Sequence, residues 1–377
     1  MGQEFATIDY IVFGLYAVLI LGVAMYMSRE KKGHVKNSSD YFLASKALPW
    51  WAIGTSLIAS NISAEQFIGM SGSGYAIGLA IASYEWMSAA ALLIIAKYFM
   101  PIFLEKKIYT MPQFLDRRYD NRVRTVMAVL WLLVYVFVNL TSVLYLGSLA
   151  LNTIMGVPLT YGIIGLAVFA ALYSIYGGLK SVAWTDFIQG LLMFAALIIV
   201  PLMALSAAGG ISGIREAMAS RDISAALIPP GSAPLLVIIS TMAWGLGYFG
   251  QPHILARFMG IKSVKDIPAA TTIAIVWVAF SLGFAVCIGL VGIPLFPELS
   301  GPASETVFIE MIRSSFTPWL GGVFLAAILS AIMSTIDSQL LVSSSALTED
   351  LYRRFAGGAP SDNKLMWIGR ASVVAIA

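Results

Sequence analysis

Long apolar segments separated by short polar stretches fill almost the whole chain of 377 residues. A helix needs about 20 mainly apolar residues to cross the hydrocarbon layer of a bilayer, so each such segment predicts a membrane-spanning helix. We predict nine complete spans, at 9–28, 49–70, 76–103, 123–152, 158–178, 183–207, 233–258, 269–295 and 317–350, and a tenth that begins near residue 364. The pattern predicts an all-α polytopic membrane protein.

Composition and isolated side chains narrow the classes of function. Hydrophobic residues make up 59% of the chain and charged residues 11%, and the mean hydropathy is +0.84, which exceeds what a water-facing surface tolerates. The single cysteine, Cys287, lies inside an apolar segment, and His34 and His253 are too far apart in sequence for a metal motif. We expect no cofactor, no disulfide and, with a net charge of only +3, no nucleic-acid partner.

Lysine and arginine residues alternate from one loop to the next. Those at or after the ends of odd-numbered spans are Arg29, Lys31, Lys32, Lys36, Lys46, Lys97, Lys106, Lys107, Arg117, Arg118, Arg122, Arg124, Lys180, Arg257, Lys262, Lys265, Arg353, Arg354 and Lys364. The even-numbered loops hold Arg215, Arg221 and Arg313. Short cytoplasmic loops accumulate basic residues, so we expect odd-numbered loops inside and the N-terminus outside. The first span has no basic n-region before it and no small-residue cleavage site after it, so it is expected to be a retained helix rather than a signal peptide.

Polar residues interrupt two of the predicted spans. The stretch "SNISAEQ" places weak helix formers inside span two, and irregular backbone at membrane depth persists only where protein or a water-filled cavity covers it. We therefore predict an unwound segment from Ala59 to Ser63. Five spans later, "TMAWGLGYFGQPHIL" places three glycines and Pro252 in the middle of span seven, which predicts a second helix break.

Two broken helices at corresponding positions of two five-helix units are typical of an inverted-repeat transporter with its site near the bilayer midplane. The expected organisation is a single transmembrane domain with an extra helix at 9–28, a first repeat at about 49–207 and an incomplete second repeat at about 233–377. A proline kink accompanied by helix-packing glycines is the alternative interpretation of each break.

Oxygen atoms suited to a cation occur on spans two and nine. Ala331, Ser334 and Thr335 fall at i, i+3 and i+4, so that one carbonyl and two hydroxyls share one stripe of span nine. Hard cations take oxygen ligands, and unwound carbonyls can hold a monovalent ion. The carbonyls of Ala59 and Ile62 would complete such a shell. The alternative is that both hydroxyls bond only to their own helix.

Three acidic residues lie in apolar surroundings. Glu85 lies well inside span three and shares a face with Ser88, so it is expected either to face a cavity or to be a structural carboxyl. Asp186 is expected near the cytoplasmic end of span six, where simple solvation would explain it, whereas Asp337 lies deeper, in span nine. Either aspartate is a candidate for relaying or binding a second cation.

These motifs resemble those of the sodium/solute symporter family over almost the whole chain. The first half, with "ASNISAEQFIGMSGSGY", "ASYEWMSA", "FVNLTSVLYLG" and "YSIYGGL", is similar to bacterial sodium/galactose and animal sodium/glucose symporters. From "AWTDFIQ" onward the chain is similar to sodium/proline symporters, through "AWGLGYFGQPHILARFM" and "AIMSTIDSQLLVSSSALTEDLY". The resemblance implies the leucine-transporter-like fold of five plus five inverted helices with one extra N-terminal helix, truncated at the C-terminus, in a bacterial-type inner membrane.

The resemblance also implies the site residues. It places sodium on the carbonyls of Ala59, Ile62 and Ala331 and on the hydroxyls of Ser334 and Thr335. The contacts of the sugar transporters match Gln66, Glu85 and Ser88, with Glu65 adjacent, and those of the proline transporters match Ser63, Trp244 and Tyr248. Each set is incomplete, because the asparagine of the sugar site is here Trp244 and the aspartate of the proline site is here Asn61.

The expected function is sodium-coupled symport, by alternating access, of a small polar solute such as galactose, glucose or proline. Sodium would be the coupling ion and the lipid bilayer the surroundings. An intramembrane enzyme is not expected, because the chain has no His-Glu-x-x-His and no Gly-x-Gly-Asp motif. A channel would need a selectivity-filter loop or rings of charge. The remaining alternative is a transport-incompetent membrane scaffold or sensor that binds sodium or solute.

Overall fold

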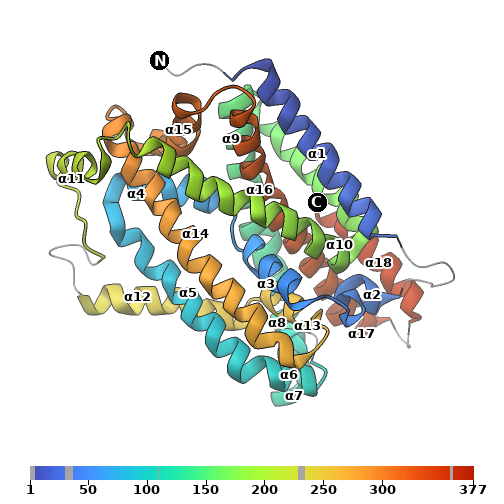
Figure 1. Cartoon of the computed structure of the whole chain (residues 1–377). Helices are drawn as coiled ribbons and strands as arrows, with labels where there is room; N and C mark the ends of the chain where they lie inside the picture. Colours follow the sequence, from blue (N-terminus) through green and yellow to red (C-terminus); the bar gives the residue numbers. More distant parts are fainter. Residues whose placement is uncertain (1–4, 30–36, 109, 228–233, 357–359) are drawn as a thin grey trace.

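The computed structural model describes residues 5–29, 37–108, 110–227, 234–356 and 360–377 (Figure 1). Within these ranges every regular element is helical, and the helices pack into a bundle. Six of them are long and apolar enough to cross a membrane: Thr7–Met27, Met87–Glu105, Asn121–Met155, Leu159–Ala204, Val264–Leu295 and Leu320–Phe355. The prediction of an all-α polytopic membrane protein with the leucine-transporter-like fold is confirmed.

Three of the six long helices, Met87–Glu105, Asn121–Met155 and Leu320–Phe355, contain a short π-helical stretch, in which the backbone hydrogen bonds reach one residue further than in an α-helix. The parts of the six long helices are α1 (Thr7–Met27), α5 (Ala82–Ile94), η4 (Ile95–Phe99), α6 (Met100–Glu105), α8 (Asn121–Leu133), η5 (Val134–Leu140), α9 (Thr141–Met155), α10 (Leu159–Ala204), α14 (Ile267–Leu295), α16 (Leu320–Ser345), η9 (Ala346–Tyr352) and α17 (Arg353–Phe355). The shorter connecting elements are α2 (Ser38–Leu43), η1 (Ala44–Lys46), η3 (Gly78–Ile81), α7 (Met111–Arg118), α11 (Gly210–Ser220), η7 (Val264–Asp266), η8 (Gly301–Thr306) and α15 (Val307–Ser315). The predicted tenth span corresponds to α18 (Asp362–Ile376).

Both predicted helix breaks are present. The second span consists of α3 (Trp50–Ala59), a non-helical stretch at 60–63, then the π-helical η2 (Glu65–Met70) and α4 (Ser71–Ile77). Span seven consists of α12 (Pro234–Gly247), the 3₁₀ turn η6 (Tyr248–Gly250) and α13 (Pro252–Met259), with Gln251 extended between them. Span two therefore continues beyond its predicted end, to the turn at Gly78.

Spans five and six form one helical stretch, α10, of 46 residues, which folds back at Gly178. This residue has φ +62° and ψ −158°, a region that only glycine occupies without strain. A Cβ atom here would also lie 2.2 Å from the carbonyl oxygen of Tyr41 in α2. The reversal therefore needs no loop, and the residues just after it remain inside the bundle.

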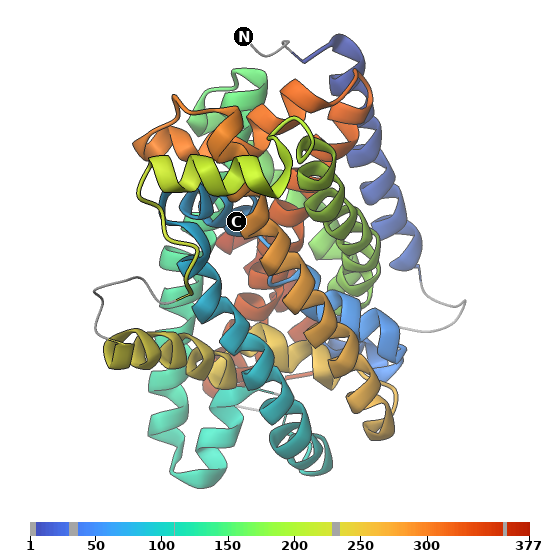
Figure 2. The same ribbon diagram turned by 60° about the vertical axis from the view of Figure 1, so that its left-hand side comes forward.

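Helix α16 forms the centre of the bundle. Of its apolar window 89% is buried, against 17% for α1 at the outside (Figures 1 and 2). The carboxylate of Asp9 on α1 reaches the start of α16, where its Oδ1 accepts hydrogen bonds from the backbone N–H groups of Trp319 and Gly322, both at 2.8 Å. The first amides of a helix lack partners within it, so Asp9 caps α16 from another helix.

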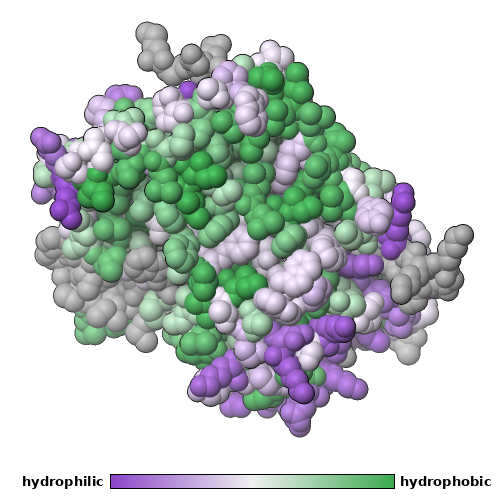
Figure 3. Space-filling view, in the orientation of Figure 1, coloured by the Kyte–Doolittle hydropathy of each residue, from purple (hydrophilic) through white to green (hydrophobic). Residues whose placement is uncertain are grey.

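The surface agrees with a membrane environment. Green, apolar residues cover the part of the molecule around α1 in Figure 3, and purple, polar residues gather at its lower end. Helices α6 and α7 lie at that lower end, opposite the N-terminus (Figure 1); Lys106 and Lys107 directly follow α6, and Arg117 and Arg118 end α7.

We expect Gly178→Ala to destabilise the protein by at least about 1–3 kcal/mol, the usual cost of a disfavoured backbone conformation, with the clash against Tyr41 adding to it. Thermal unfolding of purified protein in detergent measures this. Gly165→Ala in the same helix meets open space and is the matched control, expected to be neutral or slightly stabilising. Equal melting temperatures for both variants would contradict the role given to Gly178.

Candidate functional site

The unwound segment of span two restarts its helix with a capping box. In "SAEQ", the Ser63 hydroxyl accepts a hydrogen bond from the N–H of Glu65 at 3.0 Å, and the Gln66 side-chain oxygen accepts one from the N–H of Ser63 at 2.7 Å. A serine followed three residues later by glutamine is the sequence signature of such a helix start. The break is therefore a specified structure with its own hydrogen bonds.

This cap releases two carbonyls from helical bonding. In a continuous helix the Ala59 carbonyl would accept from the N–H of Ser63, but that N–H donates to Gln66 Oε1. The Ile62 carbonyl would accept from the N–H of Gln66, but that N–H donates to the Ser63 carbonyl at 3.2 Å. The carbonyls of Ala59 and Ile62 are thus available to another partner.

Two hydroxyls of α16 meet these carbonyls. Ser334 Oγ lies 2.7 Å from the Ala59 oxygen and 3.2 Å from the Ala331 oxygen. Thr335 Oγ1 lies 3.4 Å from the Ile62 oxygen and 3.1 Å from the Ala331 oxygen. The structure therefore brings together the five oxygens selected from the sequence. The hydroxyls do bond to their own helix, as the alternative interpretation stated, and they also bridge to the unwound segment.

The five oxygens form a buried cluster without formal charge. All five residues are buried, and the most exposed of them, Thr335, is 6% exposed. Oxygen atoms are the ligands that hard cations prefer, and three carbonyls with two hydroxyls can surround a monovalent cation without a carboxylate. Among the described residues no group of three or more His, Cys, Asp or Glu side chains could hold a transition metal.

The residues proposed for solute lie around the same break. Ser63 and Gln66 bond to each other in the capping box, while Glu65 is exposed and accepts a hydrogen bond from the Ser142 hydroxyl at 3.3 Å. Ser88 is buried in α5, and η6, which carries the buried Tyr248, packs against that helix. The side chains of Glu85 and Trp244 lie outside the described residues.

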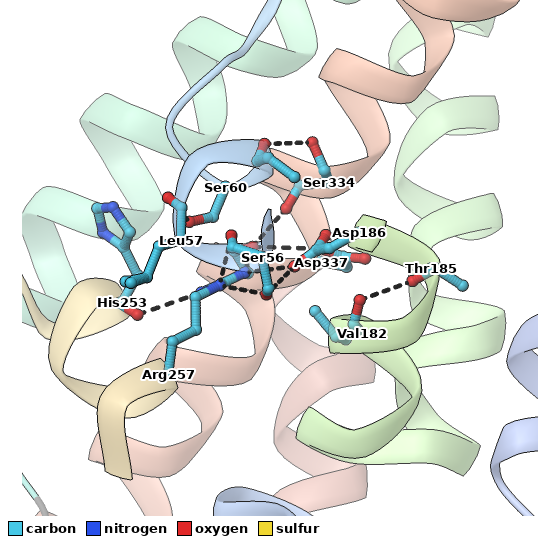
Figure 4. Close-up of polar contacts among 12 residues, drawn as sticks. Ser56, Leu57, Ser60, Val182, Thr185, Asp186, His253, Arg257, Ser334 and Asp337 are labelled. Carbon is cyan, nitrogen blue, oxygen red and sulfur yellow. Dashed lines mark hydrogen bonds and ion pairs between the residues drawn. The ribbon is translucent and has the colours of Figure 1, made fainter. Parts of the chain in front are cut away.

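A buried ion pair between Arg257 and Asp186 lies close to Ser334 of the five-oxygen cluster (Figure 4). Arg257 of α13 donates through Nη2 to Asp186 Oδ2 of α10 at 3.0 Å, and both side chains are at most 1% exposed. Arg257 also donates through Nε to the carbonyl and hydroxyl of Ser56 in α3, at 3.0 and 2.9 Å, and through Nη2 to the hydroxyl of Ser338 in α16. One guanidinium therefore connects four helices.

The expectation that Asp186 is solvated is wrong. The sharp reversal at Gly178 brings α10 back inside the bundle. Two helical turns after Gly178, Asp186 is therefore buried among α3, α13 and α16. Arg257, counted with the basic loops, is likewise a buried residue of α13. Asp337 is buried as expected and accepts a hydrogen bond from the hydroxyl of Tyr173 at 2.6 Å.

Two functional features were missed from sequence. The capping role of Gln66 was visible in the S-x-x-Q spacing, which marks the start of the second half-helix. The partner of Asp186 had no comparable signal, because Arg257 lies 71 positions away in another element.

Comparisons with known proteins agree with this architecture. The model of the sodium:solute symporter family matches residues 41–377. A sodium/glucose cotransporter of Vibrio parahaemolyticus is 43% identical over 405 residues, covering 98% of this chain and 73% of that protein. A sodium/proline symporter of Salmonella typhimurium is 34% identical over 381 residues, covering 96% of this chain and 74% of that protein.

Among solved structures, a Na⁺-coupled sialic acid symporter in a substrate-bound, outward-open state superposes with a TM-score of 0.89 at 24% identity, covering 99% of this chain and 80% of that one. The fold is thus that of a secondary transporter. The chain belongs to the sodium:solute symporter family. Its relatives are transporters rather than enzymes, which confirms the sequence-based expectation.

We expect Arg257→Met to destabilise the folded protein by about 3–5 kcal/mol, because it leaves the Asp186 carboxylate buried without a counter-charge. The double variant Arg257→Met, Asp186→Leu should recover a large part of this loss, as measured by thermal unfolding in detergent. Arg353→Met, which breaks a pair whose arginine is 51% exposed, is the control and should cost about 1 kcal/mol or less. A double variant less stable than Arg257→Met would contradict the pairing.

Proposed function

We propose that this protein is a sodium-coupled symporter that uses Ala59, Ile62, Ala331, Ser334 and Thr335 to bind the coupling ion. The observation that carries the proposal is the convergence of their five oxygens between an unwound segment and a central helix. An ion held there would tie α3 to α16. Sodium binding would thus favour the arrangement in which these two helices approach each other, and solute binding would follow.

For the solute we propose a monosaccharide such as galactose or glucose. The identity to a sodium/glucose cotransporter, 43% against 34% for a sodium/proline symporter, supports this choice. So does the polar set Gln66, Glu85 and Ser88, with Glu65 beside it, which offers hydrogen bonds to hydroxyl groups. Proline is the second candidate, because the contacts of the sodium/proline symporters match Trp244, Tyr248 and Ser63 of this sequence.

The membrane potential supplies part of the driving force. Moving one elementary charge through 100 mV releases about 2.3 kcal/mol, which corresponds to roughly a 50-fold accumulation of solute per sodium ion. We propose that the protein lies in a bacterial-type inner membrane with its N-terminus outside. The basic residues Lys106 and Lys107, between α6 and α7, and Arg117 and Arg118, in α7, lie at one end of the molecule and support this orientation, since basic loops remain cytoplasmic.

Asp186 and Asp337 are proposed as accessory residues for cation passage. Asp186 Oδ1 is buried and has no hydrogen-bond partner among the described residues, although Oδ2 is fully bonded. A buried carboxylate oxygen without a hydrogen-bond partner could accept a cation, which supports this role for Asp186. We also propose the division into an extra helix at 9–28 and two repeats, at about 49–207 and 233–377, which the two broken helices support.

Purified protein in liposomes should accumulate radiolabelled galactose or glucose only when an inward sodium gradient is imposed. Proline, offered in parallel, tests the second candidate. Accumulation without sodium would contradict the coupling. Binding of sodium or solute without accumulation of any of the three solutes would instead favour the scaffold or sensor alternative.

Ser334→Ala and Thr335→Ala should each raise the sodium concentration needed for half-maximal uptake at least about tenfold, since a contact to a charged group is worth about 1.5–3 kcal/mol. Uptake at varied sodium concentration measures this. The control is Ser330→Ala, one turn away on the same helix, whose hydroxyl bonds to Tyr16 and to the Ala326 carbonyl. An unchanged sodium dependence of uptake in both Ser334→Ala and Thr335→Ala would contradict the proposed sodium site.

A further inference from the structure

A chain of three side chains joins the two broken helices where both are interrupted. The hydroxyl of Tyr135 lies 2.9 Å from His253 Nδ1, and His253 Nε2 lies 3.3 Å from Asn61 Oδ1. Asn61 belongs to the unwound segment of span two, and His253 to the first turn of α13. Tyr135 belongs to the π-helical stretch η5, and such stretches are frequent at functional sites.

The partners fix the direction of each hydrogen bond. The Asn61 amide nitrogen donates to the Leu57 carbonyl at 3.3 Å, so its oxygen faces His253 as an acceptor. His253 must then carry its proton on Nε2 and donate it to Asn61. The free electron pair of Nδ1 accepts the proton of the Tyr135 hydroxyl. All hydrogen bonds of the chain thus run in one direction, from Tyr135 through His253 to Asn61. A displacement of Tyr135 therefore changes the hydrogen bond that Asn61 accepts.

The position of Asn61 connects this chain to the proposed sodium site. Asn61 lies two residues after Ala59 and immediately before Ile62, whose carbonyls belong to that site. A displacement of the Asn61 side chain therefore moves the backbone between both carbonyls. His253 lies two residues after Gln251, the extended residue of the second break. Tyr248 of the proposed solute site lies three residues before Gln251.

Other contacts hold α3 and α13 together farther from the two breaks, and Arg257 Nη1 also donates to the His253 carbonyl at 3.2 Å. The backbones of Leu48 and Ile261 pair with each other beyond the ends of these helices, and Arg257 bonds to Ser56 part of the way along. His253 and Asn61 form the next contact in this antiparallel series, at the level of the unwound segment. A movement of η6 can therefore displace the five oxygens through this contact while the rest of α3 and α13 stays together.

We propose that His253 is a positioning residue that couples solute binding to sodium binding through the Tyr135–His253–Asn61 chain. This inference rests on the proposed symport function. Neither His253 nor Tyr135 needs to touch sodium or solute. Their part is to hold the Ala59 and Ile62 carbonyls in the position that the solute-bound arrangement of the second broken helix requires.

The test measures the coupling itself. Affinity for radiolabelled galactose, or for radiolabelled proline if uptake selects it, is determined in detergent at low and at saturating sodium. The ratio of the two is the coupling factor, which is about 5–150-fold for linked sites and equals the factor by which solute raises sodium affinity. In His253→Leu and Tyr135→Phe we expect this factor to fall toward 1, while sodium affinity without solute changes less than about twofold.

Two further variants separate this role from a merely structural one. His253→Gln keeps a donor and an acceptor and should retain part of the coupling. Tyr41→Phe removes another buried tyrosine hydroxyl, which bonds to the Ser174 carbonyl at 2.9 Å, and should leave the coupling factor unchanged. If both His253→Leu and Tyr135→Phe keep the wild-type coupling factor, this inference is overturned and the proposed symport function is unaffected.

Equal loss of sodium affinity with and without solute overturns the inference too, because His253 would then only shape the sodium site. Wild-type protein that binds neither galactose nor proline, with or without sodium, overturns the proposed function and the inference with it. If His253→Leu elutes as an aggregate in size-exclusion chromatography, Tyr135→Phe and His253→Gln decide the outcome.

Discussion

The hydrogen bond from the Ser63 N–H to the Gln66 side chain is the constraint on which the centre of this structure depends. It ends one helical segment and starts the next inside the hydrocarbon layer, where unpaired backbone groups are costly. The same bond releases the Ala59 carbonyl, and the neighbouring rearrangement releases that of Ile62. The break thus exchanges helical hydrogen bonds for ligand atoms, with the central helix α16 as their partner.

The buried polar side chains beside this break have a different role. Arg257 and Asp186 are costly to bury, and their attraction offsets that cost only because Ser56 and Ser338 supply further hydrogen bonds. The Ser338 hydroxyl in turn donates to the Ser334 carbonyl, so the ion pair is linked to the proposed sodium site through one turn of α16. Four helices that carry or support ligand oxygens are held by a single charged group. The unwound segment of span two can therefore move locally while these four helices keep their relative positions.

Much of this arrangement was predicted from the sequence, and the features that were not predicted have identifiable physical reasons. The breaks follow from residues whose local chemistry opposes a helix, and the stripe of Ala331, Ser334 and Thr335 follows from helical spacing. The burial of Asp186 does not, since it depends on how tightly α10 reverses at Gly178. The location of Arg257 was misjudged because an arginine near a span end is usually a loop residue. The solute residues come from elements whose relative positions no spacing rule supplies, so sequence similarity alone divides them between two substrates.

The capping of α16 by Asp9 has a consequence for assembly. The carboxylate and the amides that it satisfies are 310 and 313 positions apart, at nearly opposite ends of the described chain. During synthesis the first helix enters the membrane long before its partners exist. The start of the central helix is completed only when that first helix has remained beside the growing bundle. The cap of α16 is therefore completed by a helix that lies earlier in the chain, so α1 is a folding partner of α16 as well as an outer helix.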